Sequence, residues 1–209
     1  MLFRSGNTYT NTLKLQGKLK EVTQIGAELV NDDSSAADAE IIATVIDCFN
    51  EIGISDFQIE IGQIDYFKGL VAESGISEDE ENQIKEYIHI KNFFGLEEYV
   101  DALDISESLK KAFVAFDSLF GGISMLDKAE GYVSNETSLE AVKRLRRVYA
   151  ALECYGYQDH ISFDLGMLDG YNYYTGIIFR GYTYGTGDAV VKGGRYNNLL
   201  RQFGKDAPS

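Results

Sequence analysis

Residues 170–184 read GYNYYTGIIFRGYTY, a run of aromatic and β-branched side chains punctuated by glycines. Such a composition favours a β-strand, and we predict one over residues 173–184. Alternation along this strand would place Tyr173 and Tyr174 on opposite faces, so only one of them could line a given pocket. The segment Gly185-Thr186-Gly187-Asp188 is the predicted turn of a hairpin. Further strands are predicted over residues 19–30, 56–62, 160–165 and 189–192.

Helical patterns occupy most of the chain between these strands. Residues 32–35 supply N-cap candidates for a helix that ends near Gly53, and a last helix is predicted over residues 195–203. Glycine and serine separate six further helical segments, at residues 64–74, 78–91, 95–103, 106–120, 123–131 and 135–156. Strands, a helical block and strands again predict an α+β protein whose antiparallel sheet is interrupted by a helical insertion. We assign residues 1–63 and 158–209 to the sheet and residues 64–157 to the insertion.

The 209-residue chain carries 33 acidic and 19 basic side chains, a net charge of −14 at pH 7. A phosphate-binding surface needs Lys or Arg, so this charge argues against nucleic acid as a partner. No run approaches the roughly 20 apolar residues of a membrane span, and no secretion signal is visible, which predicts a cytoplasmic protein without a membrane partner. Cys48 and Cys154 are expected to be buried thiols, not a disulfide. Two histidines are too few for a self-sufficient His/Cys metal site, so no metal is expected.

Two charged runs on predicted helices have ordinary explanations. The acidic run at residues 78–81 lies in a first helical turn, where it suits the helix dipole. The basic run at residues 143–147 is interpreted as a solvated helix face that pairs with nearby carboxylates.

The predicted strand at residues 19–30 has an unusual polar face. Gln24 and Glu28 share this face with Gly26 between them, and a glycine inside a strand often marks a close approach to the backbone. A buried glutamate needs a positive partner, either a ligand ammonium or an Arg or Lys from another segment. A solvent-facing sheet edge is the alternative, and this strand alone favours it.

Three other segments could contribute to a site. Tyrosine rings in residues 170–176 are suited to pocket walls. Gly193-Gly194-Arg195-Tyr196 exposes backbone N–H groups before a predicted helix, which favours an anion, although a plain strand-to-helix turn would explain it equally well. Phe3-Arg4, followed by a polar segment at residues 5–18 that we predict to be a loop, has no meaning alone.

Together these segments resemble the histidyl-tRNA synthetase family, which includes a non-charging paralogue, the regulatory subunit of ATP phosphoribosyltransferase. Phe3-Arg4, the 5–18 loop and the strand through Glu28 resemble motif 2. Residues 169–176, DGYNYYTG, are similar to the histidine-specific signature RGLDYYTG, and residues 193–196 match a later Gly-Gly-Arg-Tyr signature. The resemblance covers essentially the whole chain and implies a class II aminoacyl-tRNA synthetase-like antiparallel sheet.

Departures from the synthetase pattern favour the paralogue. Asp169 stands where the synthetases carry an arginine that assists histidine activation, and an anion there would oppose transition-state stabilisation. Gly6 stands where motif 2 of the synthetases has a glutamate that helps to hold ATP. The segments at residues 14–24 and 181–188 also resemble the regulatory subunit, and the acidic net charge agrees.

The resemblance therefore implies a non-catalytic regulatory subunit that supports the first step of histidine biosynthesis. The implied partner is a short-form ATP phosphoribosyltransferase catalytic subunit, with histidine as feedback effector, no cofactor, and a homo-oligomer at full length. The histidine-like pocket would comprise six residues: Arg4, Gln24, Glu28, Tyr174, Arg195 and Tyr196.

Two other functions stay open: a histidyl-tRNA synthetase fragment that activates histidine, and an unrelated α+β interaction module. Compared with the family, the chain is expected to be a fragment. It would run from motif 2 to just before motif 3.

Overall fold

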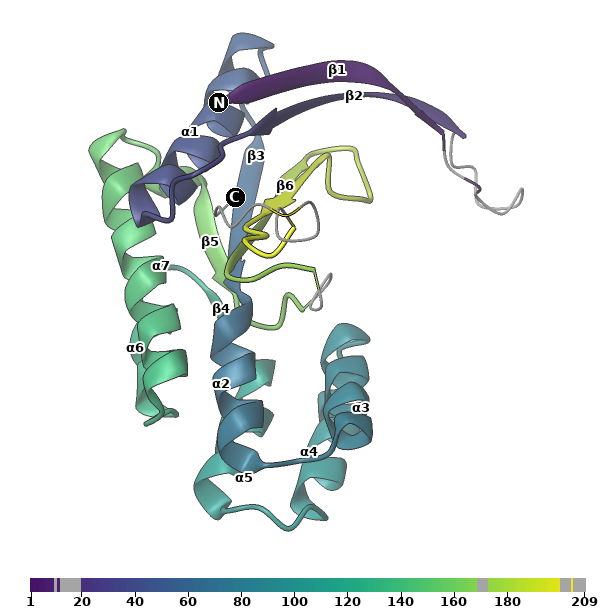
Figure 1. The fold of residues 1–209 in the computed structure, drawn as a ribbon, viewed down its shortest axis with the longest axis vertical. Helices are drawn as coiled ribbons and strands as arrows, with labels where there is room; N and C mark the ends of the chain where they lie inside the picture. Colours follow the sequence, from purple (N-terminus) through teal and green to yellow (C-terminus); the bar gives the residue numbers. More distant parts are fainter. Residues whose placement is uncertain (10, 12–19, 169–172, 200–203, 205–209) are drawn as a thin grey trace.

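The computed structural model of the protein describes residues 1–9, 11, 20–168, 173–199 and 204 (Figure 1). Its centre is a five-stranded sheet with the order β4-β5-β3-β6-β7. β3 and β5 are parallel, and every other neighbouring pair is antiparallel. The predicted α+β class with a largely antiparallel sheet is confirmed. The strands are β3 (Phe57–Gln63), β4 (Phe120–Gly121), β5 (Ile161–Asp164), β6 (Ile177–Thr183) and β7 (Val191–Gly194).

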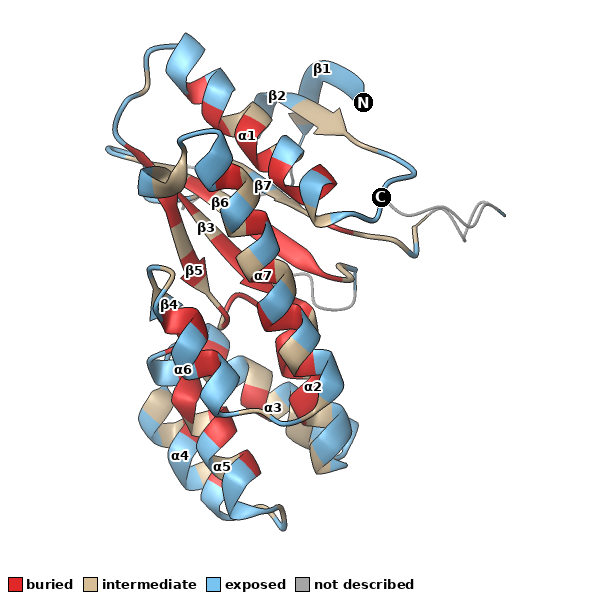
Figure 2. Ribbon diagram, turned by 90° about the vertical axis from the view of Figure 1, so that its left-hand side faces the viewer, coloured by how far each residue is buried: buried red, intermediate tan, exposed pale blue. Residues whose placement is uncertain are grey.

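One face of this sheet is buried beneath two helices. Helices α1 (Ser35–Glu51) and α7 (Glu136–Cys154) pack against each other and cover the face (Figure 2). Phe49 of α1 meets Phe57 of β3 edge-on, with ring centroids 4.8 Å apart. Alternation along β3 sends its apolar side chains to this side, because successive residues of a strand point to opposite faces. The buried β3 residues of this face are Phe57, Ile59, Ile61 and Gln63.

The helices between β3 and β5 largely follow the predicted segments, but the helix predicted over 106–120 ends by residue 117, and Phe120 belongs to β4. Sequence signals account for their ends: Ser77 and Glu80 form a capping box at the start of α3, and Gly75 ends α2 in the left-handed region with φ 66°. A continuous set of buried side chains connects these helices to the sheet, so a separate helical unit over 64–157 stays a prediction. The helices are α2 (Ile64–Ser74), α3 (Glu78–His89), α4 (Phe93–Asp101), α5 (Glu107–Val114) and α6 (Met125–Gly131), with 3-10 turns η1 (Ala115–Asp117) and η2 (Gln158–His160).

An extended hairpin forms a separate two-stranded sheet at the N-terminal end (Figure 1). Its strands are β1 (Leu2–Tyr9) and β2 (Glu21–Glu28), with Arg4 opposite Gly26. The loop predicted from residue 5 is therefore wrong for residues 5–9, which continue β1. This strand was not predicted because its polar residues have low strand propensity. Hydrogen bonds to the opposite strand compensate for that low propensity. Asn7 donates to the Glu21 carboxylate at 2.7 Å and accepts from the Thr23 hydroxyl at 2.8 Å.

Three other local predictions need correction. Tyr173 and Tyr174 precede β6, which begins at Ile177, so they are not part of its alternation. After β7 the chain makes a turn over residues 197–199, and the remainder of the helix predicted at 195–203 lies outside the described residues. Cys48 and Cys154 are free thiols, but both are exposed, because Cys48 falls off the buried stripe of α1 and Cys154 lies in the last turn of α7.

Candidate functional site

Three tyrosine rings from two separate segments form a cluster. The Tyr173 and Tyr174 rings meet edge-on with centroids 5.1 Å apart, and Tyr196 stacks on Tyr173 at 5.2 Å. Both Tyr173 and Tyr174 belong to this cluster, and the prediction that only one of them lines a given pocket stays a prediction. The segment before β6 and the segment after β7 are joined by hydrogen bonds, since the Thr175 N–H donates to the Arg195 carbonyl at 2.8 Å. This pairing holds the rings of the tyrosine cluster together.

Glu28, at the end of β2, lies close enough to this cluster to affect it electrostatically. Burial raises the pKa of the Tyr173 hydroxyl, and the Glu28 carboxylate raises it further. The pKa of Tyr174 is also raised, first by burial and then by Tyr173 and Glu28, with Arg180 opposing them. The structure thus brings Glu28, Tyr174 and Tyr196 together from three segments distant in sequence.

Glycines shape the surroundings of these groups. A Cβ on Gly194 would lie 2.7 Å from the Tyr174 ring and 2.9 Å from the backbone carbonyl of Ile177. A Cβ on Gly26 would lie 3.0 Å from Nε of Arg4, so the Arg4 side chain crosses β2 at this glycine. The close approach predicted at Gly26 is therefore a contact with this chain's own arginine.

Arg4 and Gln24 lie on the same hairpin face as Glu28, because Arg4 pairs with Gly26 and Gln24 pairs with Gly6. Both side chains are exposed, and Gln24 stands further along the hairpin, away from the end that carries Glu28. Their contact with a ligand stays a prediction. Residues 10 and 12–18 of the motif 2 loop, and Asp169, lie outside the described residues.

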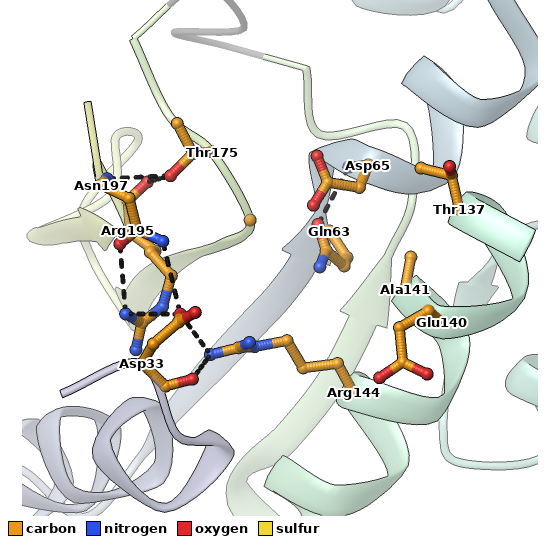
Figure 3. A pocket seen from close by; sticks show the side chains of 11 residues that line it. Asp33, Gln63, Asp65, Thr137, Glu140, Ala141, Arg144, Thr175, Arg195 and Asn197 are labelled. Atoms are coloured by element: carbon orange, nitrogen blue, oxygen red, sulfur yellow. Dashed lines mark hydrogen bonds and ion pairs between the residues drawn. The ribbon is translucent and has the colours of Figure 1, made fainter. Parts of the chain in front are cut away.

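Arg195 points elsewhere, into an ion-pair network centred on buried Asp38; Figure 3 shows Arg195 and Arg144 beside Asp33, another member of the network. Its Nε and Nη2 donate to one Asp38 oxygen at 2.9 and 2.8 Å, and Nη1 donates to the Asp32 carbonyl at 3.0 Å. Arg144 of α7 binds the other Asp38 oxygen at 2.8 Å, so one carboxylate joins two guanidinium groups. Arg195 therefore fixes the segment after β7 to the N-terminal end of α1. A direct contact between Arg195 and a ligand remains a prediction.

Sequence reasoning missed Asp38 and placed Arg144 on a solvated face. The expected carboxylate partners of the basic run are present: Arg146 binds Asp127 and Glu130, and Arg147 binds Glu140. Arg144 alone among these faces inward, with 17% of its side chain exposed. The sequence could not predict that Arg144 faces Asp38, because that contact depends on how α7 packs against α1.

A polar group on the sheet face opposite α1 and α7 was also missed. Glu60 of β3 pairs in register with Arg180 of β6, and Tyr182 follows on the same face. Burial raises the pKa of the Glu60 carboxyl, and Asp164 of β5 raises it further. Alternation along each strand could have placed Glu60 on one face of β3, and Arg180 and Tyr182 on one face of β6. Only the pairing of β3 with β6 shows that these three residues share a face.

Over the described part of the chain, no group of three or more His, Cys, Asp or Glu side chains could hold a metal ion. Among the same residues, no helix combines the length and apolar character needed to cross a membrane.

Comparison with known proteins identifies the family. A family model described as histidyl-tRNA synthetase matches residues 2–209. The chain belongs to the histidyl-tRNA synthetase family. The ATP phosphoribosyltransferase regulatory subunit of Acetivibrio thermocellus is 43% identical over 204 residues, which are 98% of this chain and 49% of that protein. The chain thus spans about half the length of the curated relatives it matches.

Solved structures in the family confirm the synthetase-like fold. A Bacillus halodurans protein described as an ATP phosphoribosyltransferase regulatory subunit/histidyl-tRNA synthetase superposes with a TM-score of 0.89 at 32% identity. The match covers 98% of this chain and 53% of that one. A chain of an ATP phosphoribosyl transferase complex from Thermotoga maritima has a TM-score of 0.75 at 18% identity, over 95% of this chain and 68% of that one. The second likeness concerns the fold alone.

Proposed function

We propose that this chain is part of a non-catalytic regulatory subunit of ATP phosphoribosyltransferase. The observation that carries the proposal is 43% identity, over 98% of the chain, to a relative that bears this name. In this role the protein would support the first step of histidine biosynthesis and its feedback inhibition by histidine. Its partner would be a short-form catalytic subunit, in the cytoplasm, and the full-length protein would be a homo-oligomer.

Glu28 and the tyrosine cluster support a histidine pocket in this subunit. In the proposed pocket, Glu28 pairs with the ligand ammonium or imidazole, Tyr174 donates a hydrogen bond, and Tyr196 closes one wall. Gln24 adds a hydrogen bond, and Arg4 and Arg195 supply nearby positive charge. Regulation would then be a coupling free energy, typically about 1–3 kcal/mol, between this pocket and a catalytic site on another chain.

Loss of activation chemistry supports a regulatory role over a charging one. Asp169 replaces a cation with an anion where a negatively charged adenylate would have to form, and Gly6 removes a carboxylate from motif 2. The net charge of −14 is also unfavourable for binding tRNA. A fragment of an active synthetase is the second candidate, because the matching family model is that of the synthetase itself.

Reconstitution with a short-form catalytic subunit tests the role. We expect the chain, or the full-length protein that contains it, to increase the rate of ATP condensation with phosphoribosyl pyrophosphate and to make it sensitive to histidine. Histidine-dependent ATP–pyrophosphate exchange should be absent. Exchange activity without stimulation of the catalytic subunit would favour the synthetase.

Calorimetric titration of histidine tests the pocket. Glu28→Gln is expected to weaken binding at least about tenfold, because it removes the ligand's ionic partner. Glu153→Gln is the matched control, since Glu153 is exposed on α7. Equal affinity of wild type and Glu28→Gln would refute the pocket while leaving the regulatory role to the reconstitution assay.

A further inference from the structure

A hollow of about 250 Å³, lined in part by Thr175 and Arg195, lies between α7 and the segments that flank β6 and β7 (Figure 3). Five segments meet around it: the loop before α1, the β3–α2 junction, α7, the segment before β6 and the segment after β7. Pockets for drug-sized ligands usually enclose about 300–1,000 Å³, so this space suits a smaller molecule. It exceeds the volume of a single water several-fold, since each water in the liquid occupies about 30 Å³.

Asp65 supplies an incompletely compensated negative charge to this hollow. No basic group among the described residues lies within ion-pair distance of its carboxylate, and the side chain is half-buried. Burial raises the pKa of the Asp65 carboxyl, although Lys68, Arg144 and a hydrogen bond from Gln63 oppose the rise. A cation bound here would therefore remove an electrostatic cost that the free protein carries.

Arg144 supplies a donor from another wall of the same hollow. Its Nε and Nη2 bind Asp38 and the loop before α1, whereas Nη1 has no hydrogen-bond partner among the described residues. Every nitrogen of the neighbouring Arg195 guanidinium is already engaged. Figure 3 shows Asp65 and Arg144 projecting from different sides, with Thr137 on the wall beside Asp65.

We propose that this hollow binds a free α-amino acid as its zwitterion, with the ammonium at Asp65 and the carboxylate at Nη1 of Arg144. The ammonium and the carboxylate of the ligand are opposite in charge to Asp65 and Arg144, and the Thr137 hydroxyl can accept a second hydrogen bond from the ammonium. The site is distinct from the proposed Glu28 pocket and shares the segment 173–176 with it. Binding in the hollow does not depend on the regulatory role proposed above.

Calorimetry on the 209-residue chain with L-alanine as the probe tests this site. L-alanine should bind, whereas ethylamine, which lacks the carboxylate, and propionate, which lacks the ammonium, should bind at least about tenfold more weakly. Failure of L-alanine to bind, or equal binding of ethylamine, would overturn the proposal.

Carboxylate variants test whether the ligand lies in the hollow. Asp65→Asn is expected to weaken L-alanine binding at least about tenfold, whereas Glu153→Gln, an exposed position on α7, is expected to leave it within a factor of two. Unchanged affinity of Asp65→Asn, or equal weakening by Glu153→Gln, would refute the hollow. Thermal melting checks that Asp65→Asn is folded, and the comparison of ligand analogues in the wild type decides the matter if it is not.

Discussion

The buried ion-pair network makes a sharp prediction for Arg195→Met. Only 6% of the Arg195 side chain and 4% of the Asp38 side chain are exposed, so solvent screens their interaction weakly. Methionine retains much of the apolar volume of the arginine stem and removes its five N–H donors. The substitution leaves Asp38 buried with one guanidinium partner instead of two. It also removes the hydrogen bonds that Arg195 donates to the backbone carbonyls of Asp32 and Ser34.

The expected cost is about 3 kcal/mol of unfolding free energy. Breaking a buried ion pair by removing one partner costs roughly 3–5 kcal/mol. The lower end applies here because Arg144 still binds the remaining Asp38 carboxylate at 2.8 Å. For a chain of this size, about 3 kcal/mol corresponds to a fall in Tm of about 6–12 °C.

Arg147→Met on α7 is the matched control. Arg147 also pairs with a carboxylate, that of Glu140, but the two side chains are 49% and 57% exposed. Exposed pairs contribute about 0–1 kcal/mol, so its Tm should fall by no more than about 4 °C.

Urea titration and thermal melting, both followed by circular dichroism, measure the difference, with equal m-values as the check for two-state unfolding. If Arg195→Met costs no more than Arg147→Met, the argument for a stabilising buried network is wrong. A double-mutant cycle with Asp38→Asn should give a coupling energy of about 0.5–3 kcal/mol between the two side chains.

Three further predictions concern glycine and a carboxylate. Gly194→Ala should weaken histidine binding and lower stability by about 1–3 kcal/mol, because its Cβ would collide with a ring of the tyrosine cluster; Gly122→Ala, where a Cβ meets nothing within 4 Å, is the calorimetric control. Gly69→Ala should lower the unfolding free energy, measured by urea titration, by about 1–3 kcal/mol, because an atom of α7 lies 2.3 Å from the added Cβ. Gly131→Ala in α6 should instead raise it by about 0.5–1 kcal/mol, and changes of the same sign in the two variants would contradict this. Burial, then a neighbouring carboxylate, raises the pKa of Glu60 in the folded state, so its contribution is present below its unfolded pKa and is lost as pH rises through the folded pKa. Glu60→Gln should therefore raise Tm at pH 7 and leave it unchanged below about pH 4, and a lower Tm at pH 7 would refute this sign.

Local signals predicted most elements of the fold. Helix α2 begins and ends where the segment 64–74 was predicted, because Gly75 supplies a left-handed stop that few other residues adopt. Strand β1 escaped prediction, since residues such as Gly6 and Asn7 have low strand propensity and are held in place by a partner 14 to 18 residues away. Register and cross-strand hydrogen bonds are not local properties of the sequence.

Some residues of the candidate site were predicted from the sequence, and others depend on tertiary packing. Glu28, Tyr174 and Tyr196 were predicted from motifs, and the structure brings them together, although ligand binding by them stays a prediction. Arg195 was predicted from the same kind of motif, but packing directs its guanidinium to Asp38. Asp65 and Arg144 of the hollow were not predicted as site residues, because they are 79 positions apart and line the same space only after β3, α2 and α7 pack.

The sequence alone determined the class of this protein: the alternation of strands, the capped helices, the acidic charge and the family motifs. These features depend on residue type and short spacing, which are present before the chain folds. The tertiary structure decided which charges are neutralised by ion pairs within the chain, as at Asp38, and which are not. That distinction depends on burial and on distances of a few ångströms between distant segments, and electrostatic interactions become strong only where water is excluded.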